Sequence, residues 1–341
     1  MIKIKKFWLY FSISVFVCFI LPAILTRRDV STISKNSVDL KEENKVENQE
    51  ESKNSEYQYQ KYGTIKLLHK STGEVEEVPI DTYLCNVVSA EMPADYELEA
   101  LKAQAVVART YTIYKAQNPK HENADICDDS TCCQAWISKE NRMNRWSEEE
   151  RENNWNKIVK AVNSTAGKII TYNNEAINAF FHSNSGGKTE IPSNVWIGGK
   201  DFPYLRSVET SGEDGYSQYS SEVKISKADL LEKLKKEYSD IQINFDENES
   251  IKILEYTQSG RVKTVEFGNT EIAGTKVRSV IGLKSTNFSI KIDGDNVIFS
   301  VTGYGHGVGM SQTGADSMAK KGKTYEEILK HFYNGVEITT I

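Results

Sequence analysis

The longest apolar block of the chain runs from Phe7 to Thr26, 20 residues without a charge. Such a run can cross the hydrocarbon core of a bilayer, which is about 30 Å thick. We expect a single-pass anchor within residues 1–28 rather than a cleaved signal peptide, because the run exceeds a typical signal core and no Ala-x-Ala-like site follows it. Lysines precede the run, so the positive-inside rule favours a cytoplasmic N-terminus and an external C-terminal part.

The hydrophobic pattern stops after this block. From Asp29 to Glu56 the chain is rich in Ser, Asn, Lys and Glu and has no aromatic residue and no proline. Such a composition buries too little apolar surface to offset the entropy of ordering. We therefore expect a flexible, disordered linker over residues 29–59 and an extracytoplasmic domain over residues 60–341.

Periodic apolar positions in that domain first predict two consecutive helices. We expect Asp81 to cap a short helix over residues 82–91, which Pro93 cannot continue. A longer helix begins at residue 97, and apolar residues three and four positions apart mark its buried face. These are Leu98, Leu101, Ala105, Ala108 and Thr112. Arg109 lies near the same face and needs an anionic or polar partner there.

The remaining pattern mixes strands with capped helices. Ser147 and Glu150 predict a helix through Val162, and Asn173-Asn174 predicts a hairpin turn. Strands are expected at 64–68, 75–78, 168–172, 176–182, 251–257, 261–267, 288–292 and 297–301, and helices at 226–237, near 311 and from 324. This order favours an α+β fold, with helices and antiparallel strands around a substrate cleft and a possible inserted lobe over residues 208–285.

Composition adds one constraint. Of the 341 residues, 39% are hydrophobic and 26% charged, which is enough for a sizeable core. The net charge of -6 and the lack of a basic stripe argue against nucleic acid or an anionic membrane surface as a partner. Any anionic ligand must therefore be bound by positive or hydrogen-bonding groups at its own site, because the overall charge does not attract it.

Glu91 is the leading candidate for chemistry. It falls in the last turn of the helix over residues 82–91, where the negative end of the helix dipole raises the pKa of a carboxyl. A carboxyl still protonated near neutral pH can act as a general acid. A solvated surface glutamate is the alternative. Asp95, Glu97 and Glu99 lie nearby at the start of the next helix, where the positive dipole end favours ionisation and weakens an acid role.

A second candidate site consists of His121, Cys127, Cys132 and Cys133, which lie within 13 residues. Tetrahedral zinc prefers these ligands. Disulfides are the alternative, because Cys85 makes the local number of cysteines even and an external location permits oxidation. We expect zinc, since adjacent cysteines bridge each other only with strain. If all four bind, no position stays open for water, which argues for a structural metal.

Two long blocks carry a resemblance to a known family. They are VVSAEMPADY from Val87 to Tyr96, with the helix after it, and GYGHGVGMSQTGA from Gly303 to Ala315. From about Gln60 onward the chain resembles the stage II sporulation protein D family of peptidoglycan lytic transglycosylases. The resemblance implies that Glu91 is the catalytic acid and base and that zinc lies near the active site. The family's zinc motif has a second histidine where this chain has Cys132.

The resemblance also makes several residues candidates for contacts to the glycan. They are Arg109, His182, Ser183, Ser185 and Gln312. On its own, the Ser- and Gly-containing loop after His182 also fits an ordinary turn. His306 fits an acid, a ligand or a buried core histidine, and Trp196 and Tyr204 fit either sugar stacking or the core.

The function implied is a membrane-anchored lytic transglycosylase, a peptidoglycan lyase that leaves 1,6-anhydro-N-acetylmuramic ends. The family setting is engulfment of the forespore at the mother-cell membrane, on glycan strands stripped of stem peptides. Expected partners are a cell-wall amidase and an integral membrane protein. Two alternatives remain: a wall-binding module that activates a partner amidase, and a zinc-dependent hydrolase.

Overall fold

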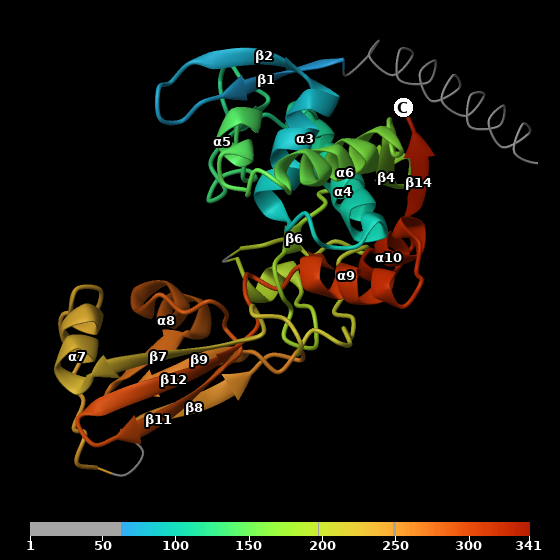
Figure 1. Cartoon of the computed structure of the whole chain (residues 1–341). Coiled ribbons are helices and arrows are strands. Elements are labelled where there is room, and N and C mark those ends of the chain that lie inside the picture. Colours follow the sequence, from blue (N-terminus) through green and yellow to red (C-terminus); the bar gives the residue numbers. More distant parts are fainter. Residues whose placement is uncertain (1–62, 197, 248–249) are drawn as a thin grey trace, which may run out of the picture. The chain divides into compact units, whose positions relative to one another are not determined.

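The computed structural model describes residues 63–341 except residues 197 and 248–249 (Figure 1). The expected anchor over residues 1–28 and linker over residues 29–59 lie outside this part. Within residues 63–341, none of the described helices combines the length and apolar character needed to cross a membrane. The described residues all belong to one compact unit.

The described part has the expected α+β character, with eight α-helices and mainly antiparallel sheets. Its main core surrounds α4, Leu98–Gln117, which is buried on all sides from Ala103 to Ile113. We expected a single buried face, but small alanine side chains let neighbours approach the helix from several directions. The neighbouring helices are α3 (Ile80–Glu91), α6 (Arg151–Asn163), α9 (Gln312–Lys320) and α10 (Tyr325–Phe332).

Three small sheets belong to the main core. They are β2-β1-β3 (Val75–Pro79, Thr64–Leu68, Ile126–Cys127), β14-β4-β5 (Glu337–Thr340, Lys168–Tyr172, Glu175–Ala176) and β13-β6 (Met310–Ser311, Phe181–His182). The hairpin at Asn173 and Asn174 is confirmed, and both residues have positive φ angles. The expected strand over residues 176–182 is instead two short strands, because β6 leaves the hairpin to pair in parallel with β13.

A second core lies between Leu230 and Val301. Its elements are β7 (Ser220–Ser226), α7 (Lys227–Lys235), β8 (Ile251–Tyr256), β9 (Val262–Phe267), β10 (Thr270–Ala273), α8 (Gly274–Ile281), β11 (Phe288–Asp293) and β12 (Asn296–Thr302). This inserted lobe begins and ends later than the predicted 208–285, because β7 pairs with β12 and closes the sheet only near residue 302.

Most of the predicted helix starts are found in the structure, but two predictions are wrong. The side chains of Ser226, Ser311 and Thr324 accept the capping bonds of α7, α9 and α10 as expected. Asp81 does not cap α3, which begins at Ile80 with Pro79 before it. The helix predicted from Ser147 begins at Arg151. The short helices α5 (Lys139–Met143) and η2 (Pro192–Asn194) were not predicted.

Candidate active site

One pocket of about 930 Å³ brings together segments that are far apart in the sequence. The end of α3, the cysteine loop, β6 and its following loop, the lobe and the start of α9 all contribute. The lining residues include Glu91, Cys132, Cys133, His182, Ser183, Arg278, Tyr304 and Gln312. Four of the residues expected at a glycan site therefore share one pocket: Glu91, His182, Ser183 and Gln312.

Glu91 is the last residue of α3, as expected, and is partly buried. Its Oε1 accepts the backbone N–H of Ala135 at 2.6 Å, and its Oε2 lies 3.5 Å from the donating Nε2 of Gln312. Burial raises the pKa of Glu91 to about 7, and these two hydrogen bonds offset only part of that rise. The raised pKa is as expected, but its main cause is burial rather than the helix dipole.

Among the described residues that line the pocket, Glu91 is the only carboxylate. Asp95 borders a different pocket, and the backbone N–H of Glu97 donates to Asp316. Glu99 accepts from Lys102 and from the backbone of Tyr325. None of the three alternative carboxyls therefore competes with Glu91 for the acid role.

The predicted metal ligands meet at one edge of the pocket. One ligand atom from each of His121, Cys127, Cys132 and Cys133 lies within 4.8 Å of the others. Nε2 of His121 is 3.7 Å from Sγ of Cys132 and 3.6 Å from Sγ of Cys133, and the two sulfurs are 3.9 Å apart. Ligands around a tetrahedral zinc lie about 3.5 to 3.8 Å apart. The four side chains therefore fit a zinc ion.

The disulfide alternative finds no support in the described residues. Cys85, Cys127, Cys132 and Cys133 are all free thiols. Cys85 is buried on α3 within the main core, so it does not belong to the cluster.

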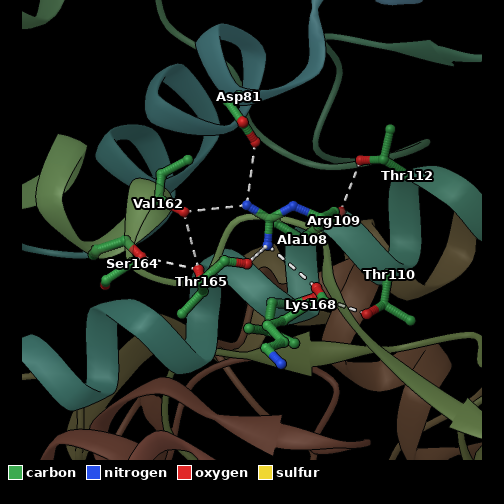
Figure 2. A network of polar contacts seen from close by, with 11 residues as sticks. Asp81, Ala108, Arg109, Thr110, Thr112, Val162, Ser164, Thr165 and Lys168 are labelled. Atoms are coloured by element: carbon green, nitrogen blue, oxygen red, sulfur yellow. Dashed lines mark hydrogen bonds and ion pairs between the residues drawn. The ribbon is translucent and has the colours of Figure 1, made fainter. Parts of the chain in front are cut away.

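Arg109 does not reach the pocket, and its predicted glycan contact is wrong. Arg109 is 1% exposed, and Figure 2 shows its guanidinium surrounded by polar partners. It donates to Asp81 Oδ1 at 3.2 Å and to the carbonyl oxygens of Thr165, Lys168 and Val162 at 2.7, 3.2 and 3.3 Å. The expectation of a polar partner is confirmed, and the arginine joins α3, α4 and the end of α6.

Ser185 is also excluded from the pocket lining, because a buried carboxylate binds it. Its hydroxyl and backbone N–H donate to Glu213 at 2.5 and 3.1 Å. Glu213 further accepts from Gly187 N–H and from the hydroxyls of Ser311 and Thr313. Glu213 therefore fastens the loop after Ser183 to the start of α9, where Gln312 lies.

Both histidines of the pocket are held neutral. Nδ1 of His182 donates to the carbonyl of Val308 at 3.2 Å, and burial lowers the pKa of His182 to about 4. Nδ1 of His306 accepts from Val308 N–H, and its ring also bonds the backbone of Phe181. His306 is partly buried and lines the pocket, so it is not a core histidine. Trp196 lines the pocket beside it, whereas Tyr204 is buried in the main core.

Several lining residues were missed. Among them, Lys115, Lys120 and Arg278 have no motif around them and reach the pocket only through folding, and Tyr304 was not singled out. Tyr304 is 43% exposed, an unusual state for a large aromatic ring beside a cleft. Its place within the Gly303-to-Ala315 block was the one available signal.

Known proteins resemble this chain in sequence. A family model described as Stage II sporulation protein matches residues 68–172, and one described as a domain of unknown function (DUF8618) matches residues 198–309. The chain is 35% identical over 280 residues to stage II sporulation protein D of Bacillus subtilis (strain 168), covering 81% of this chain and 79% of that protein. The corresponding protein of Bacillus amyloliquefaciens is 33% identical over 281 residues, with 81% and 78% covered.

The chain is therefore a sporulation protein of the stage II sporulation protein D family, which confirms the resemblance. It is also 30% identical over 306 residues to the amidase enhancer of Bacillus subtilis (strain 168). That match covers 75% of this chain and 40% of the enhancer.

Proposed function

We propose that the chain is a lytic transglycosylase that cleaves peptidoglycan between N-acetylmuramic acid and N-acetylglucosamine. The observation that carries this proposal is that Glu91 is the only carboxyl among the described lining residues, and burial raises its pKa to about 7. A glycosidase that uses water usually needs two carboxyl groups, one as acid and one as base or nucleophile. A lytic transglycosylase needs one, because the substrate supplies the nucleophile.

In the proposed reaction, protonated Glu91 gives its proton to the glycosidic oxygen as the bond to C1 of the muramic residue breaks. The Glu91 carboxylate then takes the proton of the C6 hydroxyl of that residue. O6 bonds to C1, which closes the 1,6-anhydro ring and restores protonated Glu91. The N–H groups of Ala135 and Gln312 stabilise the carboxylate between the two steps.

Product analysis tests this proposal directly. The full chain is incubated with purified glycan strands stripped of stem peptides, and the new ends are identified by mass spectrometry. Anhydromuramic ends that lack one water are expected. Reducing muramic ends would instead indicate a hydrolase.

We further propose one structural zinc per chain, held by His121, Cys127, Cys132 and Cys133. The ligand spacing supports it, and four protein ligands leave no position for a reactive water. The metal would fix the cysteine loop, from which Ala135 N–H reaches Glu91. Chelation should lower the melting temperature, and metal analysis should return one zinc per chain. Disulfide-linked Cys132 or Cys133 in metal-replete protein would contradict this site.

A second candidate function rests on the similarity to the amidase enhancer. In that function the pocket would bind glycan and the chain would stimulate a partner amidase without cleaving. The Glu91→Gln variant separates the two. Full stimulation of an amidase by this variant, with no cleavage by the wild type, would favour the enhancer role. Zinc-dependent hydrolysis is a weaker alternative, since the four-ligand site is closed.

The cellular setting proposed is the outer face of the mother-cell membrane during engulfment, in a complex with an amidase and a membrane protein. The apolar run from Phe7 to Thr26 supports the anchor. Protease protection in intact sporulating cells tests it: the C-terminal part should be cleaved from outside. Protection of that part until lysis would contradict the orientation.

A further inference from the structure

Arg278 brings a charged group of the inserted lobe into the pocket. Its Nε donates to the carbonyl of Leu283 at 3.3 Å. This bond forms because Gly282, with φ of 84°, ends α8 in a left-handed turn and folds the chain back beside the guanidinium. The bond uses Nε and leaves the two terminal amino groups for another partner.

No carboxylate of the described residues forms an ion pair with Arg278. The side chain is nevertheless partly buried. Taking a guanidinium out of water without an opposite charge is unfavourable. Arg261, the other buried arginine of the lobe, donates to Ser185 and Ser285. The unpaired charge at Arg278 therefore suggests a ligand with a negative group.

The other two cations of the pocket have nearby partners. Nζ of Lys115 lies 5.1 Å from the centre of the Tyr111 ring, and Lys120 hydrogen-bonds Cys132. With Arg278 they make three positive residues in a lining whose one carboxyl is Glu91, in a chain of net charge -6. Arginine binds carboxylates with two parallel hydrogen bonds, which sets it apart from lysine.

N-acetylmuramic acid carries a lactyl carboxylate, which is free when the stem peptide has been removed and becomes a neutral amide when the peptide is attached. The family resemblance implies a preference for glycan without stem peptides, and we propose that Arg278 is the residue that sets this preference, by binding the free carboxylate. This inference rests on the proposed function. It also gives the domain of unknown function a role, since that domain supplies the arginine.

The test changes the charge on both sides of the contact. Glycan strands without stem peptides are compared with the same strands after their lactyl carboxylates have been converted to primary amides. The wild type, Arg278→Gln and Arg278→Lys are assayed on both. Lys276→Gln is the matched control, because Lys276 lies on α8 but pairs with Glu237 at 2.6 Å.

The wild type should prefer the carboxylate strands in kcat/KM by about 10- to 100-fold, the usual contribution of a charge-assisted hydrogen bond. Arg278→Gln should lose the preference for carboxylate strands yet cleave the amidated strands like the wild type. Arg278→Lys should keep part of the preference, and the control Lys276→Gln should keep all of it. Equal cleavage of both strands by the wild type would overturn the role of Arg278, even if the variants fail to fold. An equal loss of kcat/KM on both kinds of strand in a folded Arg278→Gln variant would also overturn this role.

A different result would contradict the proposed function itself. If the wild type cleaves neither strand, that function is wrong, and binding constants for the same two strands decide the role of Arg278. A preference of about 10-fold or more for the carboxylate strand, lost in Arg278→Gln, would support it. Equal binding would overturn it.

Discussion

Replacing Glu213 by Gln should destabilise the protein in a pH-dependent manner. Glu213 is 2% exposed and accepts hydrogen bonds from Ser185, Gly187, Thr210, Ser311 and Thr313. These bonds outweigh the effect of burial and lower the pKa of Glu213 from 4.5 to about 2. An amide at this position would present N–H groups to donors and would carry no charge.

The size of the effect follows from the pKa difference. A shift from 4.5 to about 2 corresponds to about 3 kcal/mol of stabilisation at pH 7. Because the folded-state pKa is the lower one, this stabilisation is present above pH 4.5 and is lost as the pH falls toward 2. At pH 3 about 1 kcal/mol remains.

The assay is urea unfolding of the wild type and Glu213→Gln at pH 7 and pH 3. The difference between them in the free energy of unfolding should be at least about 3 kcal/mol at pH 7 and shrink by about 2 kcal/mol at pH 3. Glu209→Gln is the control, because the Glu209 side chain is 78% exposed and bonds only the surface residue Lys188 among the salt bridges. A Glu213→Gln difference that does not change with pH would refute the reasoning.

Three further predictions concern the pocket and its supports. Arg109→Met should cost about 3 to 5 kcal/mol, because it removes the ion pair with Asp81 and the donors to the carbonyl oxygens of Val162, Thr165 and Lys168, while the folded variant keeps its kcat/KM; loss of cleavage at unchanged stability would restore a glycan role. With a pKa of about 7 at Glu91, kcat/KM should be level below pH 7 and fall about tenfold per pH unit above it, and a profile that rises through pH 7 would contradict an acid role. Gly309→Ala should cost about 2 kcal/mol or more in thermal unfolding, because Gly309 has φ of 73° and a Cβ would lie 1.9 Å from the Phe180 carbonyl oxygen; unchanged stability would contradict that close approach.

Local signals in the sequence predicted much of the fold. The caps at Ser226 and Thr324 and the hairpin at Asn173-Asn174 depend on residues only a few positions apart, and the structure has them where they were expected. Asp81 shows the limit of such signals. Its carboxylate accepts a hydrogen bond from Arg109, 28 positions later, and no local pattern predicts that contact.

The site was predictable only as far as its residues lie in recognisable blocks. Glu91 and the four proposed metal ligands have distinctive neighbours, so the sequence was enough to select them as candidates. The pKa of Glu91 depends on distant segments, which bury the carboxyl and supply the hydrogen bonds from Ala135 and Gln312 that offset part of the rise. Arg278 reaches the pocket through the folding of a separate lobe. Ser185 does not line the pocket, because its hydroxyl donates to Glu213 instead.

The most direct test of the account is the cleavage of stripped glycan strands by Glu91→Gln. Glutamine keeps the size and hydrogen-bonding body of the side chain but has no proton to transfer. The variant should fold and bind glycan like the wild type yet lose a factor of about 10² to 10⁴ or more in rate, since one group serves as both acid and base. The wild type should yield only anhydromuramic ends. Unimpaired cleavage by Glu91→Gln would contradict the central claim.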